Sequence, residues 1–308
     1  MSPPALTVDD LAGDVRRIRR ERRVRRCFTV AASSTILVTF AIVATLAVQA
    51  GAFLLDVEPS SLWSDGWFPR EGKFGLPTLF VGSFYITVIA IVVAGPIGLA
   101  AAVYLSEYAR PGVRRTLKPI LEILAGIPSV IVGFFTLNFI SPQLIQRIFS
   151  GAERGNLVAA GVGVGVLIIP LIASISEDAL RSVPQSLREA STGLGARKST
   201  TVIKVVLPAA LSGIVAAFIV AVSRALGETL VVTLAAGAAG GAQMNLNPTG
   251  AGLTMTAAMA NLATGSDQVT GVGNAVKSLY LVGALLFLFT LGLNLVADRF
   301  VRRFRQAY

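Results

Sequence analysis

Uncharged apolar stretches long enough to cross a membrane recur along the chain. There are six such stretches, separated by segments that carry the charged residues: Cys27–Leu55, Phe74–Ser106, Ile123–Gln146, Gly155–Ser176, Val205–Ser223 and Ser278–Ala297. About 20 apolar residues allow a helix to cross about 30 Å of hydrocarbon. The pattern therefore predicts an all-α, polytopic membrane protein with six transmembrane helices.

The first of these stretches follows a run of arginines, as the apolar region of a signal peptide would. Its 29 uncharged residues, Cys27–Leu55, exceed the roughly 7–15 apolar residues of a signal peptide. This segment is therefore predicted to remain in the membrane as the first span.

Composition supports the membrane assignment, because 54% of the residues are hydrophobic, 14% are charged and the mean hydropathy is +0.71. Basic residues outnumber acidic ones by 27 to 17. With the N-terminus placed inside, the only basic residues outside the cytoplasmic segments are Arg70, Lys73, Arg147, Arg154 and Lys277 in outer segments and Arg224 in a span. This asymmetry predicts a multi-pass protein of the cytoplasmic membrane with both termini cytoplasmic. The excess positive charge is then explained by insertion and by anionic membrane lipid, not by nucleic acid.

The spans divide the chain into a short series of segments. These are a basic cytoplasmic tail (1–26), the first span (27–55), an outer loop (56–73), a core (74–304) that contains a cytoplasmic loop (177–208) and a Gly-rich outer loop (237–275), and a cytoplasmic C-terminus (305–308). In the first outer loop, Trp63 and Trp67 are predicted to anchor the membrane interface. In the second, a short helix is predicted near Leu253–Leu262.

Several kinds of chemistry are excluded by the residues that the chain contains. It has no His, and Cys27 is its single Cys, which excludes His-based catalysis, Cys/His zinc sites and an internal disulfide. The stretch Gly193–Thr200 lacks the glycines of a phosphate-binding loop, so the chain is not expected to bind ATP there. Gly161-Val-Gly-Val-Gly165 lies inside a span, where small residues favour close helix packing over a nucleotide site.

The cytoplasmic loop contains the most informative spacing: Glu189-Ala190-Ser191, three residues, Gly195, nine residues, Val205, one residue, Leu207-Pro208. Residues 187, 190, 191 and 194 share one face of a helix, Gly195 can stop that helix in the left-handed conformation, and Pro208 can open the next one. An ordinary basic inner loop is the alternative interpretation. The spacing resembles the EAA signature of bacterial ABC importer permeases. The resemblance implies a type I permease whose cytoplasmic coupling helix fits a groove in an ATPase subunit.

A second resemblance concerns the substrate. Arg224-Ala-Leu-Gly-Glu-Thr229, Ala125-Gly-Ile-Pro-Ser-Val130 and Asn245-Leu-Asn-Pro248 are similar to segments of the permeases of the bacterial phosphate-specific transport system. Trp67-Phe-Pro69 and Leu105-Ser-Glu-Tyr108 favour its C-type permease over the A-type. The resemblance implies a heterodimer with a second homologous permease, two ATPase subunits and an extracytoplasmic phosphate-binding protein. It also implies no cofactor on this chain, since ATP and Mg are used by the ATPase.

Arg224 and Glu228 are ionisable residues predicted to lie within a span. They are four residues apart and can form an ion pair on one helix face. If one helix runs from Val205 to about Ala236, it is about 48 Å long and Arg224 lies near its middle. The pair is either a structural link between helices or part of the translocation pathway, where the Arg fork suits phosphate oxygens. Glu228 could also accept a hydrogen bond from protonated phosphate, which fully ionised sulfate cannot donate.

Three other functions stay open on the sequence. One is a permease for another oxyanion, sulfate or molybdate. Another is a membrane-embedded lipid-modifying enzyme that uses Glu122, Glu177 or Asp178, although these acids lack a neighbouring His, Cys or metal signature. The third is an anion channel that needs no ATP, which the EAA spacing opposes.

Overall fold

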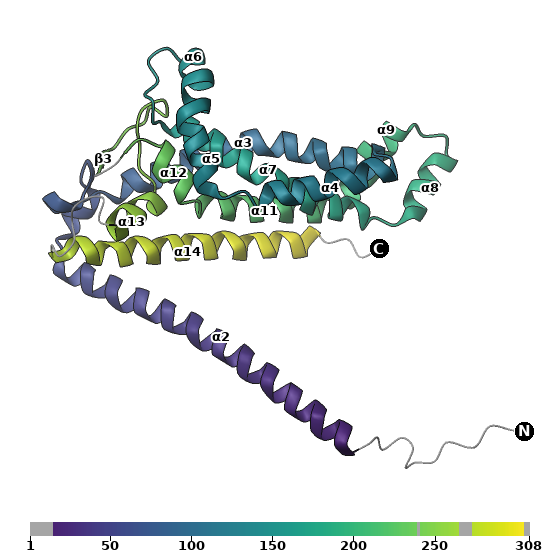
Figure 1. Cartoon of the computed structure of the whole chain (residues 1–308), viewed down its shortest axis with the longest axis horizontal. Helices are drawn as coiled ribbons and strands as arrows, with labels where there is room; N and C mark the ends of the chain where they lie inside the picture. Colours follow the sequence, from purple (N-terminus) through teal and green to yellow (C-terminus); the bar gives the residue numbers. More distant parts are fainter. Residues whose placement is uncertain (1–14, 239–240, 265–272, 305–308) are drawn as a thin grey trace, which may run out of the picture.

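The computed structural model describes residues 15–238, 241–264 and 273–304, most of which are helical (Figure 1). The α-helices are α2 (Val15–Asp56), α3 (Leu76–Val103), α4 (Pro111–Ala125), α5 (Ser129–Phe135), α6 (Gln146–Ile148), α7 (Leu157–Arg181), α8 (Gln185–Gly193), α9 (Lys198–Thr201), α10 (Leu207–Ala209), α11 (Leu211–Leu226), α12 (Leu230–Ala235), α13 (Met255–Thr264) and α14 (Gly273–Phe304). The first 14 residues of the basic tail, part of the Gly-rich outer loop (239–240 and 265–272) and the C-terminus 305–308 lie outside the described residues.

Short segments of other kinds connect these helices. Three are π-helical, namely η3 (Tyr104–Tyr108), η4 (Thr136–Ile145) and η5 (Val202–Val206), and two are 3₁₀-helical, η1 (Pro59–Trp63) and η2 (Pro69–Glu71). A small antiparallel sheet in the order β2-β1-β3 joins the two outer loops through β1 (Gly66–Phe68), β2 (Lys73–Phe74) and β3 (Ala242–Gln243).

The predicted set of spans is confirmed, with shifted boundaries. Among the described residues, five helices are long and apolar enough to cross a membrane: Arg20–Asp56, Leu76–Tyr108, Ser129–Ile148, Leu157–Arg181 and Asn274–Arg299. The pair Lys198–Ala209 and Leu211–Leu226, bent by 68°, makes a sixth when it is counted as one broken span. The short outer helix predicted near Leu253–Leu262 is α13.

The third span begins later than Ile123, where the sequence pattern placed its start. Helix α4 ends at Ala125, and a break at Gly126–Pro128 separates it from α5. Proline disfavours helical backbone at the residue before it, here Ile127, which explains the break. The part N-terminal to the break is an amphipathic helix with no buried residue, α4, that lies along α7 (Figure 1).

The fifth span is not the single long helix predicted from Val205 to Ala236. The chain bends after Ala210, two residues beyond Pro208, and it breaks again between α11 and α12 at Gly227–Thr229. Pro208 occupies the second position of α10 but continues a helical stretch that began at Lys198. Because proline has no N–H and its ring crowds the carbonyl four residues earlier, the widened π turn η5 and the bend accommodate it. Arg224 consequently lies in the last turn of α11 and not near the middle of a helix.

Helices α3 and α7 form the centre of the bundle, and glycines set their separation. A Cβ added at Gly161 would lie 2.7 Å from Ile89, one at Gly165 would lie 3.1 Å from Val93, and one at Gly98 would lie 2.9 Å from Ile172. The predicted role of the glycine repeat in close helix packing is thereby confirmed.

The outer loop uses its two tryptophans differently. Trp63 is 77% exposed, as an interface anchor would be, but Trp67 is only 1% exposed and packs edge-on against Phe74 at a ring-centroid distance of 6.0 Å. The prediction that Trp67 anchors the interface is wrong, because β1 pairs on both sides and turns this residue into the core.

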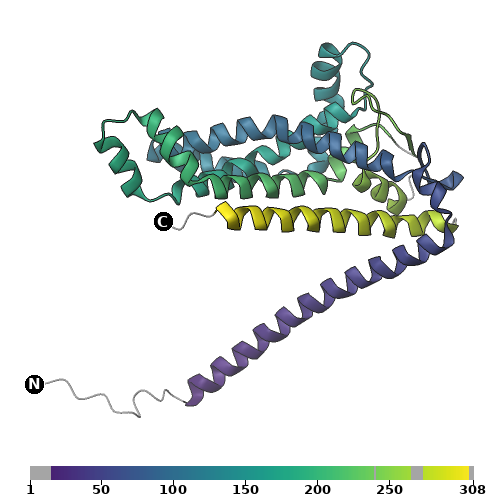
Figure 2. The same ribbon diagram turned by 180° about the vertical axis from the view of Figure 1, so that it is seen from behind.

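Helix α2 lies apart from the rest of the bundle over most of its length. Both views show it meeting α14 near its C-terminal end and diverging towards its N-terminus (Figures 1 and 2). At the meeting point Lys277 on α14 forms an ion pair with Asp56 at 2.5 Å. Only 11% of the most apolar window of α2 is buried in the chain.

Candidate functional site

The loop that carries the EAA-like spacing folds as the sequence predicts at its helix end. Helix α8 ends at Gly193, and Gly195 follows with a φ of +79°, in the left-handed region. The Gly195 N–H donates to the Thr192 carbonyl at 2.9 Å, and the Ala196 N–H donates to the Ser191 carbonyl at 3.2 Å. These bonds satisfy carbonyls that a helix end leaves free.

The face predicted from residues 187, 190, 191 and 194 is divided between two environments. Leu187 packs against a small apolar cluster formed by residues near the ends of the spans, and the Ser191 hydroxyl bonds to that of Thr201 at 2.9 Å. Glu189 and Ala190 are exposed, and Leu194 is 89% exposed. Helix α8 thus attaches to its own chain along one side and presents another side to the surroundings. Leu207 and Pro208 lie further along, at α10.

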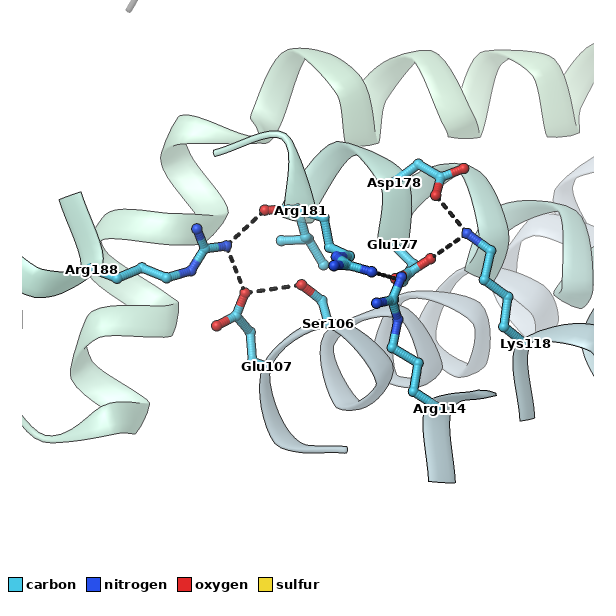
Figure 3. A network of polar contacts seen from close by, with 9 residues as sticks. Ser106, Glu107, Arg114, Lys118, Glu177, Asp178, Arg181 and Arg188 are labelled. Carbon is cyan, nitrogen blue, oxygen red and sulfur yellow. Dashed lines mark hydrogen bonds and ion pairs between the residues drawn. The ribbon is translucent and has the colours of Figure 1, made fainter. Parts of the chain in front are cut away.

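Arg188, which the sequence pattern did not single out, makes the most contacts from this helix. Its guanidinium donates to the carbonyls of Leu180 at 2.8 Å and Val183 at 2.5 Å. It also donates to the Glu107 carboxylate at 2.9 Å (Figure 3). The two charged side chains are only 16% and 8% exposed. No local pattern could reveal this pair, because its members are 81 residues apart.

A second charged cluster joins α4 to α7 (Figure 3). Glu177, 1% exposed, contacts Arg114 at 2.6 Å and Lys118 at 2.7 Å, with Arg181 at 3.9 Å, and Lys118 also bonds to Asp178 at 2.6 Å. Two of the acids considered for an enzyme are therefore neutralised in ion pairs, and Glu122 is exposed on α4. Within the described residues no three metal-ligating side chains gather.

Lys118 keeps its charge at neutral pH. Burial opposes the charge on Lys118, but hydrogen bonds and attraction from Asp178 and Glu177 outweigh it and raise its pKa above 10.5. A lysine with a raised folded-state pKa contributes its full stabilisation below the unfolded-state value and loses it as the pH rises through the folded value. The contribution of Lys118 to the contact between α4 and α7 is expected to be lost in that alkaline range.

We expect Glu177→Gln to destabilise the folded chain more than Asp178→Asn. The first change leaves Arg114 and Lys118 without their buried carboxylate, at a cost of about 1–3 kcal/mol, because both cations can be partly rehydrated. The second affects a side chain that is 64% exposed, and exposed pairs contribute about 0–1 kcal/mol. Thermal unfolding of the purified protein in detergent measures both, and equal shifts would contradict the assignment of Glu177 as the centre of the cluster.

Arg224 and Glu228 form the ion pair that their spacing predicts, with Nη1 and Oε2 3.0 Å apart. The Glu228 side chain is 3% exposed, whereas that of Arg224 is 48% exposed. The Glu228 backbone carbonyl accepts a bond from the Thr256 hydroxyl at 2.8 Å, which ties the α11–α12 break to α13. The buried Glu228 carboxylate thus contacts one terminal nitrogen of the Arg224 guanidinium. The rest of that guanidinium is open to another molecule or subunit.

Comparison with known proteins shows which families and folds the chain resembles. A family profile described as "Binding-protein-dependent transport system inner membrane component" matches residues 94–308. The chain is 37% identical over 222 residues to "Probable ABC transporter permease protein YqgH" of Bacillus subtilis, covering 70% of this chain and 72% of that protein. It is 33% identical over 255 residues to "Phosphate transport system permease protein PstC 1" of Mycobacterium tuberculosis, covering 76% and 74%.

Solved structures agree on the fold. A chain of a bacterial ABC transporter involved in the import of the acidic polysaccharide alginate matches with a TM-score of 0.62 at 14% identity, covering 94% of this chain and 100% of that one. A chain of the inward-facing MetNI methionine ABC transporter matches with a TM-score of 0.53 at 24% identity, covering 75% and 95%. The two structures share with this chain the helical architecture of a type I importer permease.

Proposed function

The chain belongs to the family of binding-protein-dependent transport system inner membrane components, and from that premise we propose that it is the phosphate-conducting permease subunit of an ATP-driven importer. Its relatives and its fold are those of multi-pass ABC transporter permeases, not of enzymes. The alternative prediction of a membrane-embedded lipid-modifying enzyme is therefore wrong.

Phosphate is the substrate that the pair of Arg224 and Glu228 supports best. Moving an anion through a low-dielectric bundle requires a cationic, hydrogen-bonding group on the way. Arg224 supplies a planar fork on an exposed face, and Glu228 holds it at 3.0 Å from the buried side. Glu228 can also accept a hydrogen bond from protonated phosphate. Fully ionised sulfate has no proton to donate, which disfavours sulfate as the alternative substrate. Relatives that carry the name of phosphate permeases support this choice over molybdate as well.

Coupling to ATP is assigned to the exposed side of the EAA loop. Glu189, Ala190, Ser191 and Gly195 with Leu207 and Pro208 would form the contact with one ATPase subunit. The observation behind this assignment is a short helix that ends in a glycine turn and exposes an apolar side chain, Leu194, 89% accessible. ATP and Mg would be bound by two such ATPase subunits, and this chain would hold no cofactor.

The complex would also contain a second homologous permease as heterodimer partner and an extracytoplasmic phosphate-binding protein. In this arrangement the chain supplies half of the pathway, and both of its termini lie in the cytoplasm. The basic segments between spans support that orientation.

The orientation predicts which introduced thiols react from outside the cell. In a Cys27→Ser background, Ser60→Cys, on an exposed position of η1, is expected to react with a membrane-impermeant maleimide added to intact cells. Ser199→Cys, on an exposed position of α9, is expected to react only after the cells are opened. Gel-shift labelling measures both, and the reverse pattern would place the EAA loop away from any cytoplasmic ATPase.

The substrate is tested with the complete complex in proteoliposomes together with its binding protein. Phosphate is expected to stimulate ATP hydrolysis and to accumulate inside, whereas sulfate and molybdate at equal concentration are not. Stimulation by sulfate or molybdate instead would overturn the phosphate assignment. Uptake that persists with a hydrolysis-dead ATPase would indicate a channel.

A further inference from the structure

Helix α8 reaches two membrane spans through one side chain. Its main packing partners are the segments that follow it in the chain, α9 and η5. Arg188 extends in a different direction and bonds to the C-terminal end of α7 and to Glu107 in η3, the cytoplasmic end of α3 (Figure 3). We propose that Arg188 is a positioning residue for transport, which locks α8 to α7 and α3 so that a movement imposed on α8 reaches both spans directly. This inference rests on the proposed coupling role of the EAA loop.

The geometry of the guanidinium explains why arginine occupies this position. Three acceptors surround it, the carbonyls of Leu180 and Val183 and the Glu107 carboxylate, at 2.5–2.9 Å. The Leu180 carbonyl lies in the last turn of α7 and the Val183 carbonyl lies just beyond that helix, where the helix dipole is negative and favours a cation. A planar fork can bond to three acceptors from two helices at fixed angles, whereas a lysine ammonium fixes no such plane.

Burial makes this link stiffer than an ordinary surface ion pair. With side-chain exposures of 16% for Arg188 and 8% for Glu107, the two groups are screened less by water than exposed pairs are. The Ser106 hydroxyl also donates to Glu107 at 2.9 Å. The hydrogen bond from Ser106 thus helps to fix the orientation of the carboxylate that Arg188 contacts.

The segment that receives the contact is also distinctive. Glu107 lies in η3, where the helix has π geometry, and the other polar contact of α8, between Ser191 and Thr201, ends one residue before the π-helical η5. Single π turns mark places where helical register is locally altered, often at functional sites. Both polar contacts of α8 therefore meet the chain at or next to a π-helical segment.

The test follows the distance between α8 and α3 in the complex of the full chain with its ATPase. Spin labels are placed at Ser186→Cys on α8 and Tyr104→Cys on η3, both exposed, in a Cys27→Ser background. In the otherwise unchanged chain the distance is expected to stay the same with and without ATP, because the two helices move together. In Arg188→Gln and in Glu107→Gln it is expected to change on ATP addition.

Transport supplies the second readout. Both variants are expected to retain ATP hydrolysis but to import about tenfold less substrate per ATP, since each loses at least the charge-assisted hydrogen bond between Arg188 and Glu107. Arg188→Lys should restore only part of the ratio. The control is Arg110→Gln, which removes an exposed cytoplasmic charge whose side chain forms no ion pair among the described residues.

Unchanged distances and an unchanged import ratio in Arg188→Gln would overturn the proposal. If that variant fails to assemble, Glu107→Gln decides, because it keeps the bonds from Arg188 to the carbonyls of Leu180 and Val183. Co-purification of the ATPase with the unchanged chain tests the coupling assignment separately. The distance measurement needs neither phosphate nor the binding protein, so a different substrate would leave it valid.

Discussion

Replacing Arg224 by glutamine is expected to lower phosphate uptake by about 10- to 100-fold, which corresponds to the roughly 1.5–3 kcal/mol of a charge-assisted hydrogen bond. The half-exposed guanidinium would otherwise meet the anion on the open face of α11. Arg224→Lys should recover little, because it keeps the charge but loses the fork. Uptake of labelled phosphate into proteoliposomes, normalised to the amount of assembled complex, measures the effect.

The burial of Glu228 makes a second variant necessary for this prediction. Arg224→Gln alone leaves a 3%-exposed carboxylate without the cation that it contacts, which costs stability whatever the role of Arg224. The double variant Arg224→Gln with Glu228→Gln removes both charges and should restore assembly. Continued absence of uptake would then assign Arg224 to the pathway, whereas wild-type uptake would reduce the pair to a structural link.

Gly195→Pro is expected to abolish ATP-driven uptake by removing the turn that ends α8. Proline fixes φ near −65° and has no N–H, whereas Gly195 has a φ of +79° and donates to Thr192. The exposed end of α8 would lose its shape and with it the contact with the ATPase. Co-purification of the ATPase and uptake measured on the same preparation report the loss.

Alanine substitutions in the same turn provide matched controls. A Cβ at Gly195 or at Gly193 meets nothing within 4 Å, so Gly193→Ala, within the helix, should behave as the unchanged chain. Gly195→Ala should cost only about 1 kcal/mol for its left-handed backbone and keep most activity. Normal co-purification and uptake in the proline variant would remove the EAA loop from the coupling path.

Features set by neighbouring residues could be predicted from the sequence. The long apolar stretches specified the spans, because hydrocarbon thickness fixes the number of residues a helix needs. The turn at Gly195 and the pair of Arg224 and Glu228 followed from spacings of a few residues, which helical geometry turns directly into contacts.

Features set by residues far apart in the chain could not be predicted in this way. Glu177 finds Arg114 and Lys118 at separations of 63 and 59 residues, and Arg188 finds Glu107 at 81. Hydropathy also does not distinguish a side chain in the membrane interface from one in the protein interior. The sequence therefore could not show that Trp67 is buried while Trp63 is exposed. The bend at Ala210 could not be predicted from hydropathy, because the apolar pattern continues across it. The break at Gly227–Thr229 follows the end of the apolar stretch at Ser223 and contains Glu228.

The isolation of α2 has a consequence for how the chain is made. Its main partner, α14, is translated about 220 residues later, which at a synthesis rate of about 5–20 residues per second is a delay of roughly 10–40 s. During that interval α2 must reside in lipid with few contacts to its own chain. Its long uncharged stretch, preceded by a run of arginines, suits a helix that inserts into the membrane before α14 is made.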